Sequence, residues 1–210
     1  TKDPVLISLL SAFVMLPWLL FAIPIGLIVD RSNKRLLITF TNSIRFITAG
    51  LVALAISTDT ITIYWLLLAT FLIGTCEVAT DTATQSLIPV ILEKKNFEKA
   101  NSRLNIAETV IQNFIGAPLS GFLYATAIVL PFILNSLGFL IAAIFVLMIP
   151  AHLISRGSSA VDTDEEKKSF FSDIKFGLNY LWNDRPLRRL VATTTSLGFF
   201  YSLSTSTLIL

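Results

Sequence analysis

The sequence predicts an all-α membrane protein, a polytopic bundle of helices, and three observations lead to this fold class. Of its 210 residues 54% are hydrophobic and only 14% are charged, whereas soluble domains carry about 25% charged residues. The apolar residues form long blocks, and residues 4–29 contain no charge at all. Most basic residues lie in or next to alternate loops. Blocks of about 20 residues cross the hydrocarbon core as helices, and these blocks lack the alternation typical of a transmembrane β-barrel.

Six helical spans follow from the apolar blocks. We expect them at residues 4–28, 36–57, 61–85, 103–125, 127–150, and from 187 to the last residue. Because the first residue is Thr1 and the last block stops within an apolar run, we also expect the sequence to be a fragment of a longer protein.

The basic residues predict which loops face the cytoplasm. Of the 16 Lys and Arg residues, 12 lie in the first, third and fifth loops, at residues 29–36, 86–103 and 151–186, and Arg188 and Arg189 follow directly after the fifth loop. Cytoplasmic loops hold the excess of basic residues in membrane proteins. We therefore expect these loops in the cytoplasm, and a multi-pass protein of the plasma membrane, which in a bacterium is the inner membrane.

The fifth loop predicts a division of the chain into parts. Its first half is rich in Ser, Asp and Glu, which is typical of a flexible linker. From about residue 169 to 184 the apolar side chains recur at helical spacing, which predicts an amphipathic helix on the membrane surface. We expect a membrane bundle over residues 1–150, this cytoplasmic segment over 151–186, and a second membrane unit that begins at 187–210.

The sequence offers few residues for a metal site or a catalytic site. The single cysteine, Cys76, excludes an internal disulfide and is expected to be a small buried side chain. The one histidine, His152, is expected at a solvated interface. With no catalytic constellation in the sequence, we expect neither an enzyme nor a cofactor or metal.

The first basic loop carries a recognisable motif. A glycine is followed by an aspartate–arginine pair and two further basic residues: Gly26, Asp30, Arg31, Lys34 and Arg35. This pattern resembles the signature between helices two and three of the major facilitator superfamily. Asn33 stands where that signature has a second glycine, and Asn is the next best residue in the left-handed conformation. We therefore expect the turn of the signature to be kept through a left-handed Asn33.

The resemblance covers nearly all of the chain. It implies a twelve-helix plan in which the six spans correspond to helices two to seven, so that helix one and helices eight to twelve lie outside the sequence. Residues 88–92 with Phe97 and Asn101, and residues 170–178, are similar to the branch of enterobactin-type siderophore exporters and macrolide efflux pumps.

The resemblance also implies an activity. It points to a secondary active transporter that exports an amphipathic small molecule, a drug or siderophore, by proton-coupled alternating access. Its partners would be the lipid bilayer, the small-molecule substrate, protons and the second half of the same protein, with no nucleic acid. Two alternatives stay open: a scaffold or accessory protein that does not transport, and a lysophospholipid-type flippase of the same superfamily.

Asp30 lies at the cytoplasmic end of a helix, where the helix dipole disfavours a carboxylate. It therefore needs a partner, which a basic neighbour in the motif supplies locally. The resemblance implies a further partner, because in the family this aspartate latches onto a helix of the other half. The plain alternative is an interfacial charge that obeys the positive-inside rule.

Four ionisable side chains lie inside the spans, where a charge is costly unless it is paired or wetted. Arg45 and Glu77 are at similar depth, which predicts an ion pair; the alternative is an Arg45 that reaches the interface alone. Asp81 shares a helix face with Glu77, and Glu108 lies at a depth comparable to Asp81. These three carboxylates are the candidates for carrying a proton, Glu77 first. The alternative for Asp81 and Glu108 is pairing with basic residues near the loops.

Small residues gather in the fourth span. Gly116 and Ser120, and Ala117 and Gly121, are each four apart, which permits close helix contact. The segment resembles the antiporter motif of helix five, but Ala117 separates the glycine from Pro118. We expect helix packing here, or a hinge at Pro118.

Overall fold

The computed structural model describes residues 4–92, 94–150, 179–180 and 182–207, and within them every regular element is a helix. The all-α membrane bundle that the sequence predicts is therefore confirmed. The chain divides into two units, residues 1–162 and 163–210, and each is described by itself. Most of the expected loop 151–186, with His152 and residues 169–178 of the expected amphipathic helix 169–184, lies outside the described residues.

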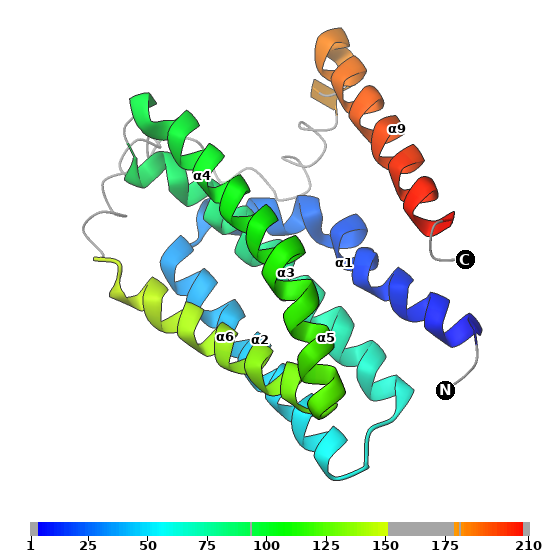
Figure 1. Ribbon diagram of the computed structural model, residues 1–210. Coiled ribbons are helices and arrows are strands. Elements are labelled where there is room, and N and C mark those ends of the chain that lie inside the picture. Colours follow the sequence, from blue (N-terminus) through cyan, green and yellow to red (C-terminus); the bar gives the residue numbers. More distant parts are fainter. Residues whose placement is uncertain (1–3, 93, 151–178, 181, 208–210) are drawn as a thin grey trace. The chain divides into compact units, whose positions relative to one another are not determined.

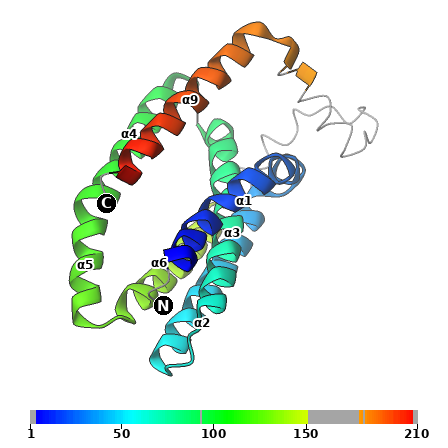
Figure 2. The same ribbon diagram turned by 90° about the vertical axis from the view of Figure 1, so that its right-hand side faces the viewer.

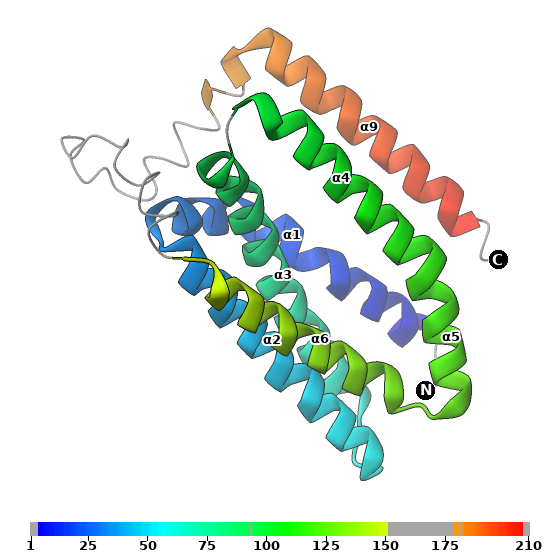
Figure 3. The same cartoon turned by 60° about the vertical axis from the view of Figure 1, so that its left-hand side comes forward.

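The helices of the first unit are shown in Figure 1. They are α1 (Pro4–Arg31), α2 (Lys34–Ser57), α3 (Ile63–Ile91), α4 (Phe97–Val110), α5 (Ala117–Thr126) and α6 (Leu130–Met148). A single 3-10 turn, η1 (Lys94–Asn96), precedes α4, and a π-helical segment, η2 (Ile111–Gly116), joins α4 to α5. Figure 3 shows α4, η2 and α5 as one continuous rod.

Four described helices are long and apolar enough to cross a membrane. They cover Phe13–Arg31, Lys34–Ser57, Ile63–Pro89 and Leu130–Met148. The spans expected at 103–125 and from 187 onward are also helical, but neither belongs to these four. The first of them is divided by the π-helical segment, and the second is rich in hydroxyl side chains.

The loops are shorter than the charge pattern suggested. Only residues 32 and 33 separate α1 from α2, and the expected loop 86–103 shrinks to residues 92–96, because α3 continues to Ile91 and α4 begins at Phe97. Lys, Arg and Glu are good helix formers. Their appearance therefore marks where a helix leaves the apolar part of the membrane rather than where the helix ends.

The connections of the first unit alternate between its two ends. In Figures 1 and 3 the α1–α2 and α3–α4 connections lie at one end, and the α2–α3 and α5–α6 connections lie at the other. The first end carries Arg31, Lys34, Arg35 and the basic residues that follow α3, whereas Thr58–Thr60 at the second end contains none. The helices thus bring the first two basic loops to the same side, as the charge pattern predicts.

Helix α2 packs against both α3 and α6, and Figure 2 shows it beside α3. Toward α3, the hydroxyl oxygens of Thr41 and Thr80 lie 2.7 Å apart. Toward α6, the buried hydroxyl of Ser136 donates to the carbonyl of Phe46 at 2.8 Å, and the Arg35 guanidinium donates to the carbonyl of Leu147. Polar bonds of this kind hold apolar helices together, and the two bonds between α2 and α6 fix the register of that antiparallel pair.

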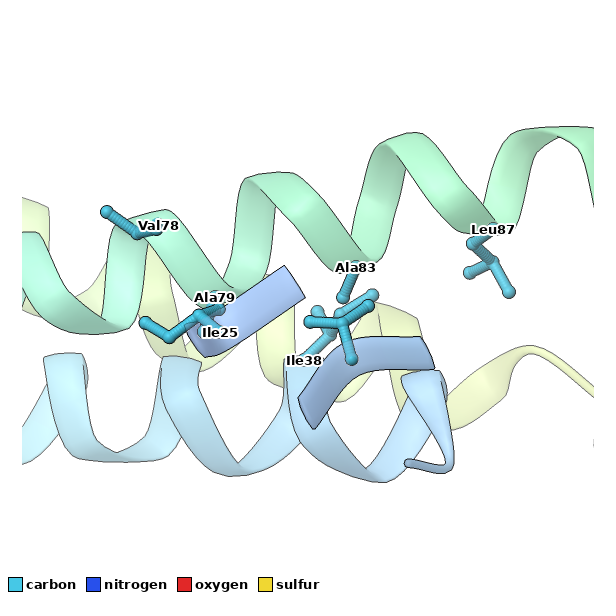
Figure 4. Close-up of a cluster of buried hydrophobic side chains, with 7 residues drawn as sticks. Ile25, Ile38, Val78, Ala79, Ala83 and Leu87 are labelled. Carbon is cyan, nitrogen blue, oxygen red and sulfur yellow. The ribbon is translucent and has the colours of Figure 1, made fainter. Parts of the chain in front are cut away.

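Helix α1 packs against α3 through small and apolar side chains. A cluster of buried residues joins the helices near the first basic loop: Ile25, Val29, Ile38, Val78, Ala79, Ala83 and Leu87, most of which Figure 4 labels. Further along, Pro17 is fully buried, and a Cβ on Gly74 would lie 3.1 Å from the Pro17 ring. Phe71 meets Phe13 and Phe21 edge-on at 6.0 and 5.9 Å. Gly74 is therefore what lets α1 and α3 approach.

The second unit contains α9 (Arg185–Thr207). The Asp184 carboxylate accepts a hydrogen bond from the Leu187 N–H at 3.1 Å and so caps the first turn. The Arg188 guanidinium donates to the Trp182 carbonyl at 3.2 Å. The hydroxyls of α9 donate to carbonyls of the preceding turn on the same helix, at Thr193, Thr194 and Ser196.

Replacing Gly74 by leucine should destabilise the α1–α3 contact. The side chain would be driven into the Pro17 ring, and overpacking of this kind costs roughly 1–3 kcal/mol. The measurement is the melting temperature of the detergent-solubilised protein. Gly138→Leu on α6 is the control, since a Cβ there meets nothing within 4 Å. Equal melting temperatures for the two variants would contradict the close contact at Gly74.

Candidate functional site: a charged pair and an acidic cleft

The motif at the first basic loop forms the junction between α1 and α2. Asp30 and Arg31 end α1, both are exposed, and the Asp30 carboxylate makes no ion pair with the described residues. Lys34 begins α2, and Arg35 is tied to the end of α6 by its bond to the Leu147 carbonyl. A Cβ on Gly26 would meet nothing within 4 Å. The described elements therefore leave the surface around Gly26 and Asp30 free.

Asn33 does not adopt the left-handed conformation that the sequence suggested. Its backbone is extended, with φ −69° and ψ 103°, and its side-chain oxygen accepts a hydrogen bond from the Leu36 N–H at 3.3 Å. Asn33 is thus the N-cap of α2, and its side chain satisfies one of the backbone N–H groups that have no partner within the first turn of a helix. The expectation of a left-handed Asn33 was wrong, because capping α2 keeps the short turn without a positive φ.

Arg45 and Glu77 form the ion pair that the sequence predicts. The Arg45 Nη2 lies 3.8 Å from the Glu77 Oε2, and the side chains are 13% and 45% exposed. Both residues lie near the middle of their helices, α2 and α3. The separation is longer than a charge-assisted hydrogen bond of about 2.8 Å, so this is a loose ion pair.

Arg45 has a second partner that the sequence did not reveal. Its guanidinium carbon lies 4.1 Å from the centre of the Phe139 ring on α6, within the range of a cation–π contact. The Arg45 Nε is buried and makes no hydrogen bond. Arg45 is therefore held from two sides, by a carboxylate on α3 and a ring on α6.

Glu77 also faces a cleft between α3 and α4, which has a volume of about 800 Å³. One face of α3, one face of α4 and the start of η2 form its wall: Glu77, Asp81, Thr84, Gln85, Ile88, Pro89, Phe97, Glu98, Asn101, Leu104, Asn105, Glu108 and Gln112. Clefts of about 300–1,000 Å³ that combine apolar surface with a few polar groups are typical of small-molecule sites.

The cleft brings together the three carboxylates singled out as proton carriers. Glu77 and Asp81 lie one turn apart on α3, and Glu108 projects from α4 into the same cleft. Neither Asp81 nor Glu108 has an ion-pair partner among the described side chains, so the alternative of pairing with nearby basic residues receives no support there. Their role in carrying a proton stays a prediction.

The small-residue segment of the fourth span contains the π-helical turn. The Ala117 N–H bonds to the Gln112 carbonyl, five residues back. Pro118 explains this, because it has no N–H to donate and its ring would clash with the carbonyl four residues earlier in a regular helix. A Cβ on Gly116 would lie 3.1 Å from the Ile111 carbonyl oxygen, so a glycine suits this turn.

The packing role predicted for these small residues stays a prediction. Gly116 and Ser120 line a smaller cleft against α6, of about 420 Å³. A Cβ on Gly121 would meet nothing within 4 Å among the described residues. The hinge at Pro118 stays a prediction, and the π-helical turn beside it is where such a hinge would bend.

The site also contains residues to which the sequence analysis assigned no role. The polar residues along one face of α4 and the start of η2 carried a signal, since Asn101, Asn105, Glu108 and Gln112 follow each other at helical spacing. Phe139 carried none, because one phenylalanine in an apolar helix looks like any other. Cys76 is buried, as expected. Within the described residues no group of His, Cys, Asp and Glu is arranged to hold a metal ion.

Comparison with known proteins gives one result. The family model described as Major Facilitator Superfamily matches residues 2–210. No curated protein and no solved structure matches the chain.

Asn33→Ala should destabilise the protein by ~1 kcal/mol, because the first turn of α2 loses its cap. Asn33→Ser retains a capping oxygen and should melt close to the unchanged protein. Thermal unfolding in detergent measures both. A gain in stability for Asn33→Gly would instead indicate a left-handed residue at this position.

Reversing one charge of the pair, by Arg45→Glu or Glu77→Arg, should lower the yield of folded protein, because like charges then face each other inside the bundle. Combining the two reversals should recover part of the yield. The measurement is the monodisperse fraction in size-exclusion chromatography. Arg45→Glu combined with Glu98→Arg is the matched control, since Glu98 lines the cleft without contacting Arg45; recovery there as well would contradict a specific pair.

Proposed function

The chain belongs to the Major Facilitator Superfamily, whose members are membrane transporters and not enzymes, and on that premise we propose proton-coupled export of an amphipathic small molecule. The protein would be a secondary active transporter that works by alternating access. The observation that carries the proposal is the cleft between α3 and α4, which Glu77, Asp81 and Glu108 line, with Glu77 also paired to the partly buried guanidinium of Arg45.

Glu77 is the proposed coupling residue. It is the carboxylate that touches both a fixed cation and the cleft. A carboxylate in this position exchanges its proton with water that enters the cleft. Each time it binds or releases a proton, its ion pair with Arg45 is weakened or restored. Ionisable groups placed in this way inside membrane bundles mark ion and substrate paths.

The wall of the cleft suits an amphipathic substrate. Amide and hydroxyl groups at Thr84, Gln85 and Asn101 offer hydrogen bonds, whereas Ile88 and Leu104 offer apolar surface. A drug or siderophore with both polar and apolar parts fits this mixture better than a simple sugar or ion does. Export from a bacterial cytoplasm through the inner membrane is the setting we propose.

The motif residues would control the cytoplasmic gate. Asp30 is exposed at the end of α1 with no ion pair to the described residues, and a Cβ on Gly26 meets nothing nearby. An unpaired carboxylate at a helix C-terminus gains from a partner with positive potential, such as the N-terminus of another helix. The proposed partner of Asp30 belongs to the second half of the transporter. Lys34 and Arg35, at the start of α2, would flank this contact.

The test is a susceptibility screen of cells with and without the protein, over amphipathic drugs and siderophores. Cells with the protein should tolerate at least one compound better, and the advantage should vanish when the proton gradient is collapsed. Protection that survives collapse of the gradient would contradict proton coupling. No protection against any compound would favour a scaffold, and lysophospholipid movement without drug export would favour a flippase.

Glu77→Gln should reduce gradient-driven export to the level of cells without the protein, because a glutamine cannot release a proton. Asp59→Asn is the control, since it neutralises an exposed carboxylate in the loop between α2 and α3 that does not line the cleft. Export rates in inverted membrane vesicles measure the effect. Normal gradient-driven export by Glu77→Gln would remove Glu77 from the coupling mechanism.

A further inference from the structure

We infer that Phe139 is a positioning residue that gives Arg45 a partner which does not depend on the protonation of Glu77. The inference rests on the proposed function of Glu77 in proton coupling. Its basis is geometric: Arg45 lies between the Glu77 carboxylate at 3.8 Å and the Phe139 ring at 4.1 Å.

The need for such a partner follows from the ion pair itself. When a Glu77 oxygen binds a proton from water in the cleft, the carboxylate becomes neutral and Arg45, which stays charged, loses its counter-ion. Its side chain is only 13% exposed and its Nε makes no hydrogen bond, so water replaces little of what is lost. A guanidinium near the middle of a membrane bundle is costly without a partner.

Other charged groups near the pair do not remove this need. Asp81 on α3 lies one turn from Glu77, and Glu108 on α4 faces the same cleft. Neither carboxylate is in ion-pair contact with Arg45, and Cys76, which precedes Glu77 in the sequence, is a buried free cysteine. The ring of Phe139 is therefore the contact that remains when Glu77 is neutral.

The ring is held in place from the α6 side. One turn before it, the buried Ser136 hydroxyl bonds to the carbonyl of Phe46, the residue next to Arg45. A Cβ on Gly50 would lie 3.4 Å from the same hydroxyl oxygen, so α2 and α6 are in close contact here. The attraction of a ring face for a cation does not change when a nearby acid gains a proton. Phe139 thus lowers the cost of the neutral state of Glu77.

A double-mutant cycle on the full-length protein tests the inference. Phe139→Leu leaves Arg45 its carboxylate, and Glu77→Gln leaves it the ring, so each single change should lower the melting temperature modestly. The double variant strands the guanidinium and should lose more than the sum of the single losses. Adding Arg45→Met to the double variant should restore part of the loss, because the stranded charge is gone.

Matched variants separate this role from simple packing. Phe139→Tyr keeps a ring and should behave like the unchanged protein in the Glu77→Gln background. Phe145→Leu, an exposed phenylalanine on the same helix, should show additive losses with Glu77→Gln. Additive losses for Phe139→Leu, or no recovery with Arg45→Met, would overturn the inference, since a packing residue costs the same in every background.

Transport kinetics supply the second readout. Phe139→Leu should lower the maximum rate of gradient-driven export and leave the KM for the substrate unchanged, because Phe139 lies behind Arg45 and outside the cleft. A raised KM with an unchanged maximum rate would overturn the inference. The melting cycle needs no transport, so an inference that fails there is distinguishable from a proposed function that fails in the export assay.

Discussion

The first unit depends on the placement of one cation. Arg45 sits near the middle of α2, and a guanidinium at that depth is tolerated only where neighbouring helices supply partners. Helix α3 supplies a carboxylate and α6 supplies a ring. Helix α2 also makes its other polar contacts between helices with α3 and α6, through Thr41, the Phe46 carbonyl and Arg35. The charge that is hardest to bury thus lies on the helix with polar contacts on both sides.

The contacts of α1 and α3 are of a different kind. They are made by Pro17, Gly74 and a cluster of Val, Ile and Ala side chains. Because lipid is as apolar as these side chains, close packing and small residues, rather than removal of apolar surface from water, hold such an interface together. Helix α3 therefore presents an apolar face to α1 and a carboxylate-bearing face to α2 and to the cleft. Because its two faces differ, α3 holds Glu77 and Asp81 at the wall of the cleft and not against α1.

Much of the fold could be predicted from the sequence, because long apolar blocks and the positions of Lys and Arg are properties of local composition. The ion pair of Arg45 and Glu77 was accessible for the same reason, since depth follows from counting residues at 1.5 Å each. Helix ends were less accessible, because charged residues extend helices beyond the membrane. The conformation of Asn33 was mispredicted: the residue caps α2, and among described non-glycine residues the positive φ belongs to Asp59, in the loop after α2.

The contact of Phe139 with Arg45 lay beyond sequence reasoning for a physical reason. A cation–π contact leaves no mark in composition or charge balance, and it depends on the register of α6 against α2, which the Ser136 hydroxyl sets from one turn away. An ion pair can be predicted because two opposite charges within apolar blocks are conspicuous in a sequence. A phenylalanine in such a block is ordinary and gives no such indication. Partners of a cation that carry no charge are therefore visible only in the packed structure, and their contact with the cation does not depend on the protonation of any carboxylate.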